Sequence, residues 1–298
     1  MHGILIVDKP EGFTSHDVVA KLRGMLRTKS IGHTGTLDPF ATGVLVCLIG
    51  KATRLAQFLD KAEKEYLATI SFGYSTDTGD HTGSPKSEAQ NLKSFSFEEI
   101  ENALTKFRGA IEQTPPMYSA KKIAGKKLYE LARQGKEVER QAVKINISEL
   151  ELIETKDETA IVRVVCSAGT YIRVLGEDIG RELNTGAHLE ELRRTRAGNF
   201  DLQRAVTLAD LQKLADAGAV ETILIAPNDA LAHLPFVVLG ENEVRKTLNG
   251  MAAMTDLNFG NNQTMRMIDR QNNLVAVGAF DASENSVKPR IVIGLAAD

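Results

Sequence analysis

The chain is poor in the residues that cross-link a protein or anchor it in a membrane. Its 298 residues include two cysteines, eight prolines and no tryptophan. Cys47 and Cys166 lie in separate apolar, strand-like runs, so buried core thiols are expected rather than a disulfide framework or a zinc site. No stretch approaches the roughly 18 apolar residues of a membrane span, and the N-terminus lacks the pattern of a signal peptide. We therefore expect a soluble, cytoplasmic protein.

A strong charge of one sign is also missing. The formal net charge is -3, which argues against a protein that coats nucleic acid indiscriminately. Positive charge is nevertheless concentrated locally: residues 121–144 carry eight Lys or Arg against three Glu, and smaller clusters lie at 21–29 and 192–196. A solvated helix face would explain the first cluster. The three together favour a directed surface for a polyanion.

Strand and helix patterns alternate irregularly along the first 230 residues. Residues 3–9, 143–154 and 159–167 read as strands, and a helix is expected to begin at Thr14 or Ser15. Because there is no regular βαβ rhythm, the pattern predicts an α+β fold with a mixed, mostly antiparallel central sheet flanked by helices.

Two domains are expected from the length and from a change in the sequence pattern near residue 235. Beyond it, short strand candidates alternate with Gly, Asn and Asp turns, and a short helix is expected over 241–248. The predicted domains are 1–234, with a basic insertion at about 114–144, and a small strand-rich domain at 235–298.

Asp38 is the single carboxylate of the stretch GHTGTLDPFATGVLVCLIG. Pro39 disfavours the α-helical region for the residue before it, so Asp38 is expected in an extended conformation. It fits a simple Asp-Pro turn, a nucleophile, a general base or, with His33, a metal ligand. A glycosidase would need a second acid, and Asp77 or Asp80 more readily shapes its own loop. These residues alone do not name a reaction.

Six motifs in this order and spacing resemble the TruB family of bacterial tRNA pseudouridine synthases. They are VDKP, GHTGTLDPFATGVL, YLATISFGYSTDTGD, PPMYSAKK, GTYIR and LRRT, and the resemblance spans residues 5–196. The tail is similar, more loosely, to a PUA-type RNA-binding domain. The resemblance implies a pseudouridine-synthase fold with a PUA-like C-terminal domain.

The resemblance also implies the reaction and its catalytic group. A T-loop uridine at position 55 of tRNA would be flipped out, cut from its ribose and rejoined through carbon, without a metal or an organic cofactor. Asp38 matches the catalytic aspartate, either as a nucleophile on the sugar or as a base that leads to a glycal. Arg173 matches the arginine that pairs with it, which would explain an arginine near a predicted helix N-terminus.

The remaining site residues are carried over from the same motifs. Tyr66 would stack on the flipped base, Tyr171 and Leu192 would line the pocket, His33 would enter the T-loop, and Lys9 would support the floor of the site. The basic segment 121–144 would close over the T-arm. The implied protein is a monomer that binds the T-arm stem-loop and needs no protein partner or membrane.

Two other functions remain open at this point. An RNA chaperone could fold tRNA without the chemistry, and such an activity is compatible with the isomerase because flipping bases already opens the T-loop. The third hypothesis is a guide-dependent synthase that works within a ribonucleoprotein. The absence of a Lys-rich tail from the sequence argues against it.

Overall fold

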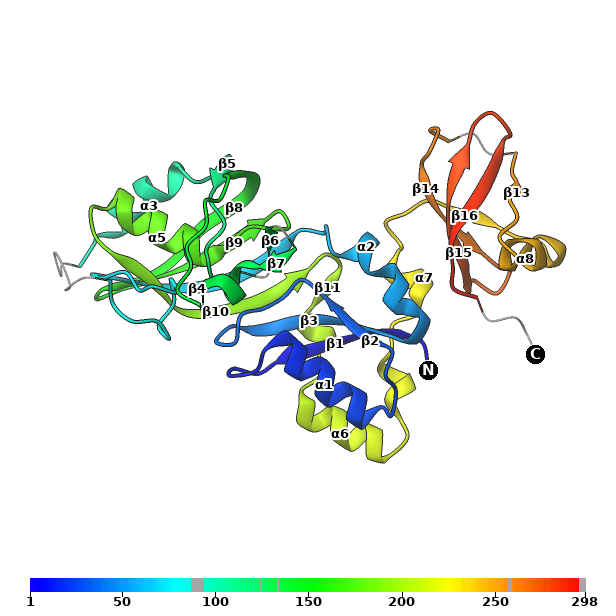
Figure 1. The fold of residues 1–298 in the computed structure, drawn as a ribbon, viewed down its shortest axis with the longest axis horizontal. Coiled ribbons are helices and arrows are strands. Elements are labelled where there is room, and N and C mark those ends of the chain that lie inside the picture. The colour runs from blue at the N-terminus through cyan, green and yellow to red at the C-terminus, as the bar shows by residue number, and fades with distance from the viewer. Residues whose placement is uncertain (87–93, 120, 124, 133, 257–258, 295–298) are drawn as a thin grey trace.

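A larger N-terminal domain and a smaller C-terminal domain stand side by side in the structure (Figure 1). It is a computed structural model that describes residues 1–86, 94–119, 121–123, 125–132, 134–256 and 259–294. The larger domain is built on a nine-stranded sheet and the smaller on a five-stranded one.

The central sheet runs in the order β1-β3-β10-β4-β9-β8-β5, with β2 on β3 and β11 on β10. Its strands are β1 (Gly3–Lys9), β2 (Ile31–Thr34), β3 (Thr42–Ile49), β4 (Lys64–Phe72), β5 (Gly109–Gln113), β8 (Val143–Lys156), β9 (Thr159–Cys166), β10 (Ala187–Ala197) and β11 (Phe200–Asp201). β3 and β10 pair in parallel, whereas the other neighbours in this order pair antiparallel. The predicted mixed, mostly antiparallel sheet is confirmed.

Helices cover one face of this sheet. Apolar side chains of α1 (Ser15–Met25) and α6 (Leu208–Asp216) pack on β1 and β3, and those of α3 (Phe97–Thr105) and α5 (Ile172–Glu182) pack on the half that contains β4, β8 and β9. Thr14 caps α1 by accepting a hydrogen bond of 3.0 Å from the backbone N–H of Asp17, so the first of the two expected caps is the one used.

The opposite face carries shorter elements at the β1–β3 end. They are a 3-10 turn, η1 (Gly50–Leu55), and the four-residue α2 (Ala56–Leu59) that follows it. Three more short elements lead to the C-terminal domain: η2 (Leu202–Arg204), η3 (Val220–Ile223) and α7 (Pro227–Ala230).

β10 corrects the sequence-based interpretation of residues 192–196. The sequence predicts an exposed basic cluster, but these residues lie on a strand in the middle of the sheet. Successive side chains of a strand point to opposite faces, so this run of arginines is divided between the interior and the surface. Arg194 is 1% exposed and is therefore no part of a surface for a polyanion.

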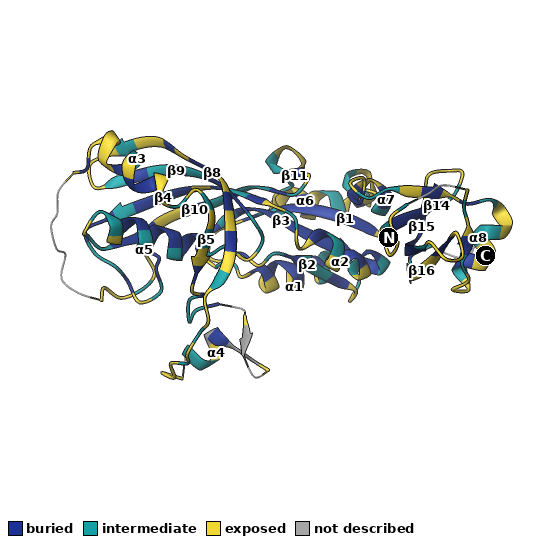
Figure 2. Ribbon diagram, turned by 90° about the horizontal axis from the view of Figure 1, so that it is seen from above, coloured by how far each residue is buried: buried dark blue, intermediate teal, exposed yellow. Residues whose placement is uncertain are grey.

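The basic segment projects from the body of the larger domain (Figure 2). It contains β6 (Lys122–Ile123), β7 (Lys126–Lys127) and α4 (Leu128–Ala132). Ala124 and Arg133 of the predicted segment lie outside the described residues.

The C-terminal sheet has the order β12-β14-β15-β16-β13. Its elements are β12 (Phe236–Val238), the predicted helix α8 (Glu241–Leu248), β13 (Ala253–Met254), β14 (Thr264–Ile268), β15 (Leu274–Asp281) and β16 (Ser286–Val292).

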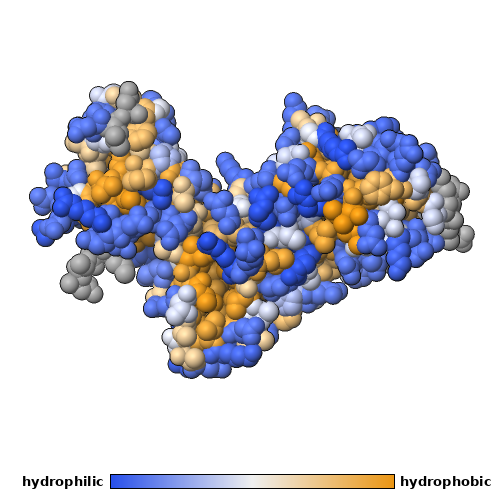
Figure 3. Space-filling view, turned by 180° about the vertical axis from the view of Figure 1, so that it is seen from behind, coloured by the Kyte–Doolittle hydropathy of each residue, from blue (hydrophilic) through white to orange (hydrophobic). Residues whose placement is uncertain are grey.

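The C-terminal domain docks on η1 of the larger domain. Lys51 Nζ donates to the carbonyl of Gly294 at 3.0 Å, and Arg54 Nη1 to that of Val292 at 2.7 Å. Apolar residues of β15 and β16 join the core cluster that contains β1 and η1. The surface is notched between the two domains (Figure 3). Within the described part of the chain, no helix is long and apolar enough to cross a membrane.

Candidate active site

One row of residues across the central sheet lies beneath the site. Lys9 on β1 pairs with Gly43 on β3, Gly43 with Arg194 on β10, and Arg194 with Tyr66 on β4. Residues opposite one another on paired strands share a face, so the three side chains point the same way. Gly43 has φ +101°, and a Cβ there would lie 2.2 Å from the carbonyl oxygen of Arg194. The close approach of β3 and β10 therefore requires glycine at this position.

The loop that carries Asp38 connects β2 to β3 and is tied to the start of α1. Ser15 Oγ accepts a hydrogen bond of 2.9 Å from the backbone N–H of Leu37 and donates one of 3.2 Å to the carbonyl of the same residue. The N–H of Ala41 donates to the carbonyl of Asp38 at 3.2 Å, which closes the turn.

Lys9 holds the same loop from below. Its buried ammonium donates to the carbonyl oxygens of Pro10, Phe13 and Pro39 at 2.9, 2.6 and 3.1 Å. Burial lowers the pKa of Lys9 to about 8, an effect that the nearby Asp38 carboxylate partly opposes. Lys9 thus contacts the backbone just after Asp38, without lining the cavity itself.

Asp38 and Arg173 form an ion pair at the N-terminus of α5. Arg173 Nε lies 2.8 Å from Asp38 Oδ2, and Arg173 Nη2 donates to Oδ1 at 3.2 Å. The guanidinium also donates to the carbonyls of Thr78 at 2.6 Å and Tyr118 at 2.7 Å, and it lies 3.5 Å from Asp80 Oδ2. Partners on three segments fix its orientation, and the arginine near the helix N-terminus has the expected carboxylate partner.

Opposing effects act on the pKa of the Asp38 carboxyl group. Burial raises its pKa above the ordinary value, the Arg173 charge works against that rise, and the neighbouring Asp80 adds to it. The Asp38 side chain keeps 35% exposure, whereas that of Arg173 has 5%. The carboxylate thus faces the cavity while its partner is buried behind it.

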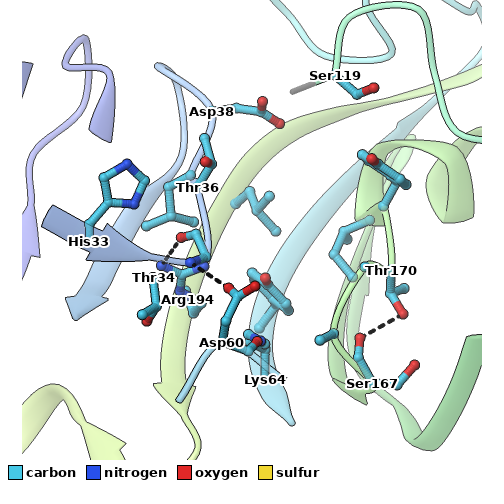
Figure 4. A pocket seen from close by; sticks show the side chains of 18 of the residues that line it. His33, Thr34, Thr36, Asp38, Asp60, Lys64, Ser119, Ser167, Thr170 and Arg194 are labelled. Atoms are coloured by element: carbon cyan, nitrogen blue, oxygen red, sulfur yellow. Dashed lines mark hydrogen bonds between the residues drawn. The ribbon is translucent and has the colours of Figure 1, made fainter. Parts of the chain in front are cut away.

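A cavity of about 520 Å³ opens above this row of residues (Figure 4). Six of the predicted site residues line it: His33, Asp38, Tyr66, Tyr171, Arg173 and Leu192. Its volume falls within the range of roughly 300–1,000 Å³ that is typical of small-molecule sites.

His33 lies on β2 at the edge of the cavity (Figure 4). Burial lowers its pKa, so the imidazole is neutral at physiological pH. Its Nδ1 atom is buried and has no hydrogen-bond partner among the described residues. A neutral ring with an unused nitrogen can bind a polar group of a ligand.

Arg194 belongs to the LRRT motif, but the sequence analysis gave it no role in the site. Its Nε donates to the carbonyl of Val44 at 2.7 Å and its Nη2 to that of Gly35 at 2.8 Å, so it joins β3 to the Asp38 loop. Burial raises the pKa of Tyr66, and the charge of Arg194 opposes this rise. No alternation of apolar and polar residues in LRRTR marks Arg194 as the arginine that faces inward.

The far end of the cavity is lined by Lys64, Asp60, Ser167 and Thr170 (Figure 4). Lys64 is buried, its ammonium donates to the carbonyl of Asp60, and burial lowers its pKa. Asp60 Oδ1 accepts from the backbone N–H of Gly35 at 3.1 Å. This end of the cavity is also rich in polar side chains.

Asp77 and Asp80, the alternative acids, shape the loop between β4 and α3. Asp77 Oδ1 accepts from the N–H of Ser84 at 2.8 Å, and Asp80 Oδ1 from that of Thr82 at 3.1 Å. The Asp80 bond, to the residue two positions on, is of the kind that holds an Asx turn, whereas the Asp77 bond spans seven residues and joins the two ends of the loop. In the described ranges, no group of three or more His, Cys, Asp and Glu residues could hold a metal ion.

Comparison with protein families identifies two matching models. One is described as "TruB family pseudouridylate synthase (N terminal domain)" and matches residues 23–172, and the other as "tRNA pseudouridylate synthase B C-terminal domain" and matches residues 173–232. The second match ends before β12, so it lies within the larger domain.

Curated relatives share this similarity over most of their length. A tRNA pseudouridine synthase B of Solibacter usitatus is 42% identical over 280 residues, which cover 93% of this chain and 95% of the relative. One of Geobacter sulfurreducens is 44% identical over 249 residues, covering 83% of this chain and 82% of the relative.

Solved structures agree in fold. An H/ACA RNP bound to a substrate RNA containing 2'-deoxyuridine superposes with a TM-score of 0.76 at 26% identity, covering 98% of this chain and 85% of the other. A Cbf5-Nop10-Gar1 complex gives a TM-score of 0.74 at 28% identity, covering 99% and 84%.

Proposed function

Because the chain belongs to the TruB family of pseudouridylate synthases, we propose that it isomerises the T-loop uridine at position 55 of tRNA to pseudouridine, with Asp38 as the catalytic group. The observation that carries this proposal is the Asp38–Arg173 ion pair, whose carboxylate faces a cavity of nucleotide size.

The proposed reaction rearranges bonds within one nucleotide. The bond from N1 of the base to C1′ of the ribose breaks, and a bond from C5 to C1′ forms. N1 gains a proton and C5 loses one, so the product is an isomer of the substrate. Whether Asp38 attacks the sugar or removes a proton to give a glycal, it must be ionised, and Arg173 favours that form.

Base flipping supplies the substrate to the cavity. Taking a base from its stack costs a few kcal/mol, and stacking on an aromatic side chain returns roughly 1–3 kcal/mol. Tyr66 is 8% exposed and lines the cavity beside Leu192 and Tyr171, so it is the group we assign to stack on the uracil and to relay a proton. His33 at the edge is assigned to the space that the extruded bases leave.

The T-arm is the proposed partner of the basic segment. Lys121 and Lys136 are exposed on a projection that stands clear of the sheet, where they can follow an RNA backbone (Figure 2). We assign the C-terminal domain a PUA-like, RNA-binding role, and we propose that opening the T-loop also lets the protein act as a tRNA-folding chaperone. We expect a cytoplasmic monomer that works without a protein partner or a guide RNA.

The test is the position of the product. Purified protein is incubated with an unmodified tRNA transcript and with its isolated T-arm hairpin, in the presence of a chelator and without any other protein or RNA. Pseudouridine at the T-loop uridine of both substrates is the expected result. Binding without product, or product that requires a guide RNA, would contradict the proposal.

A further inference from the structure

Ser119 has a buried hydroxyl without a hydrogen-bond partner. Its side chain lies where the segment after β5 crosses the mouth of the cavity, and the residue is 6% exposed. Among the described residues, Ser119 Oγ finds neither a donor nor an acceptor. Leaving a buried polar group in this state costs roughly 1–3 kcal/mol, and a hydrogen bond to a ligand can recover that cost.

The backbone holds this hydroxyl beside the catalytic pair. The N–H of Ser119 donates to the carbonyl of Met117 at 3.0 Å, and the carbonyl of the preceding Tyr118 accepts from Arg173 at 2.7 Å. Arg173 in turn binds Asp38. Ser119 accordingly lies toward the Asp38 end of the cavity, away from Lys64 and Ser167 (Figure 4).

Unsatisfied atoms of this kind recur in the cavity. The buried Nδ1 of His33 lines the same cavity and also has no partner in the described part of the chain. Ser286 Oγ is also buried and has no partner among the described residues, but it lies in the C-terminal sheet. Ser286 therefore offers a matched control, with the same side chain and the same hydrogen-bonding state in another domain.

We propose that the Ser119 hydroxyl binds the ribose 2′-hydroxyl of the target nucleotide. This inference rests on the proposed function, because the action of Asp38 on the sugar brings the ribose to this end of the cavity. A serine hydroxyl and a 2′-hydroxyl can each donate and accept, so they complement each other. The contact gives the site a means of distinguishing RNA from DNA at the target nucleotide.

The test compares two hairpins on an enzyme that binds without turnover. T-arm hairpins with uridine or 2′-deoxyuridine at the target position are titrated against Asp38→Asn protein, and the ratio of the two Kd values is measured. One neutral hydrogen bond corresponds to a ratio of roughly 3 to 10 in favour of uridine. Adding Ser119→Ala should bring the ratio close to 1, whereas adding Ser286→Ala should leave it unchanged.

Thermal unfolding separates this role from a structural one. Since Ser119 Oγ has no partner among the described residues of the free protein, Ser119→Ala should leave the Tm of the unliganded chain unchanged or slightly raised. A ratio that persists in Ser119→Ala, or equal weakening of both hairpins, would overturn the proposal. Absence of pseudouridine formation by the wild-type protein would instead count against the proposed function.

Discussion

Arg193 and Arg194 are neighbours on β10, yet they face two different environments. Arg193 points to the outer face of the sheet, where its side chain is 39% exposed and its Nη2 lies 2.8 Å from Asp8 Oδ2. Arg194 points to the inner face, is 1% exposed, and donates to the carbonyls of Val44 and Gly35. In the described residues, no carboxylate lies within ion-pair distance of Arg194.

The same contrast extends across both faces. On the outer face, Arg163 pairs with Glu65, Glu149 and Glu151 at 2.5–3.2 Å on partly exposed side chains. On the inner face, Lys9 is held by backbone carbonyls. Exposed pairs contribute about 0–1 kcal/mol each because water screens them, whereas buried donors on fixed carbonyls are costly to remove. At these positions the outer face is open to solvent, whereas the inner face orients the site.

Among substitutions on the inner face, removal of Arg173 should cause the largest loss of turnover. Arg173→Ala leaves Asp38 without its cation and frees the carbonyls of Thr78 and Tyr118. We expect turnover to fall by about 100- to 1,000-fold, with a much smaller change in T-arm affinity. Single-turnover kinetics and binding assays check this. A normal single-turnover rate would exclude Arg173 as the partner of Asp38.

The two neighbouring arginines provide the sharpest pairwise comparison. Arg194→Met should lower the free energy of unfolding by roughly 1–3 kcal/mol for each carbonyl left unsatisfied, and it should slow turnover because β3 and the Asp38 loop lose their shared anchor. Arg193→Met should change the free energy of unfolding by less than about 1 kcal/mol. Urea unfolding of both variants measures the difference. Equal effects would show that the two faces are not distinct in the way described.

Charge reversal on the projecting basic segment should weaken RNA binding and leave both faces of the central sheet unchanged. Lys121→Glu with Lys136→Glu should reduce T-arm affinity and lower the salt slope by roughly one for each phosphate that is no longer neutralised. Lys213→Glu on α6 makes the same type of charge change at an exposed side chain outside this segment. Affinity measured across salt concentrations checks the prediction. An unchanged slope in the double variant would reduce the segment to a solvated surface.

Substituting two neighbours of Asp38 should shift the pH dependence of activity in opposite directions. Activity needs the carboxylate, so it falls as the pH drops through the raised pKa of Asp38, above the ordinary 3.8. Arg173→Gln removes the cation that opposes the rise, which moves the acid limb to higher pH. Asp80→Asn removes a charge that adds to the rise, which moves it to lower pH. Shifts of the same sign in pH–rate profiles would contradict this electrostatic account.

Local patterns predicted the parts of the fold that depend on local physics. The strand before Lys9, the Thr14 cap and the helix over 241–248 follow from periodicity and capping, and they are present in the structure. The family motifs singled out Asp38 and Arg173, which are 135 residues apart in sequence and form an ion pair in the structure. Periodicity alone could not have paired them.

β10 could not be predicted in the same way, because both of its faces carry arginine. An amphipathic strand is identified by alternation of apolar and polar residues, and LRRTR lacks it. The inward Arg194 is tolerated because the carbonyls of Val44 and Gly35 accept from it, a long-range arrangement that its own neighbours do not reveal. The hydroxyl of Ser119 is likewise visible only once the cavity is assembled.

The most direct test of the account is single-turnover pseudouridine formation by wild-type protein and Asp38→Asn on the same T-arm hairpin, with binding measured in parallel. The account predicts product from the wild type, none from Asp38→Asn, and similar affinities for both. Product formation at the wild-type rate by Asp38→Asn would contradict the assignment of Asp38 as the catalytic group.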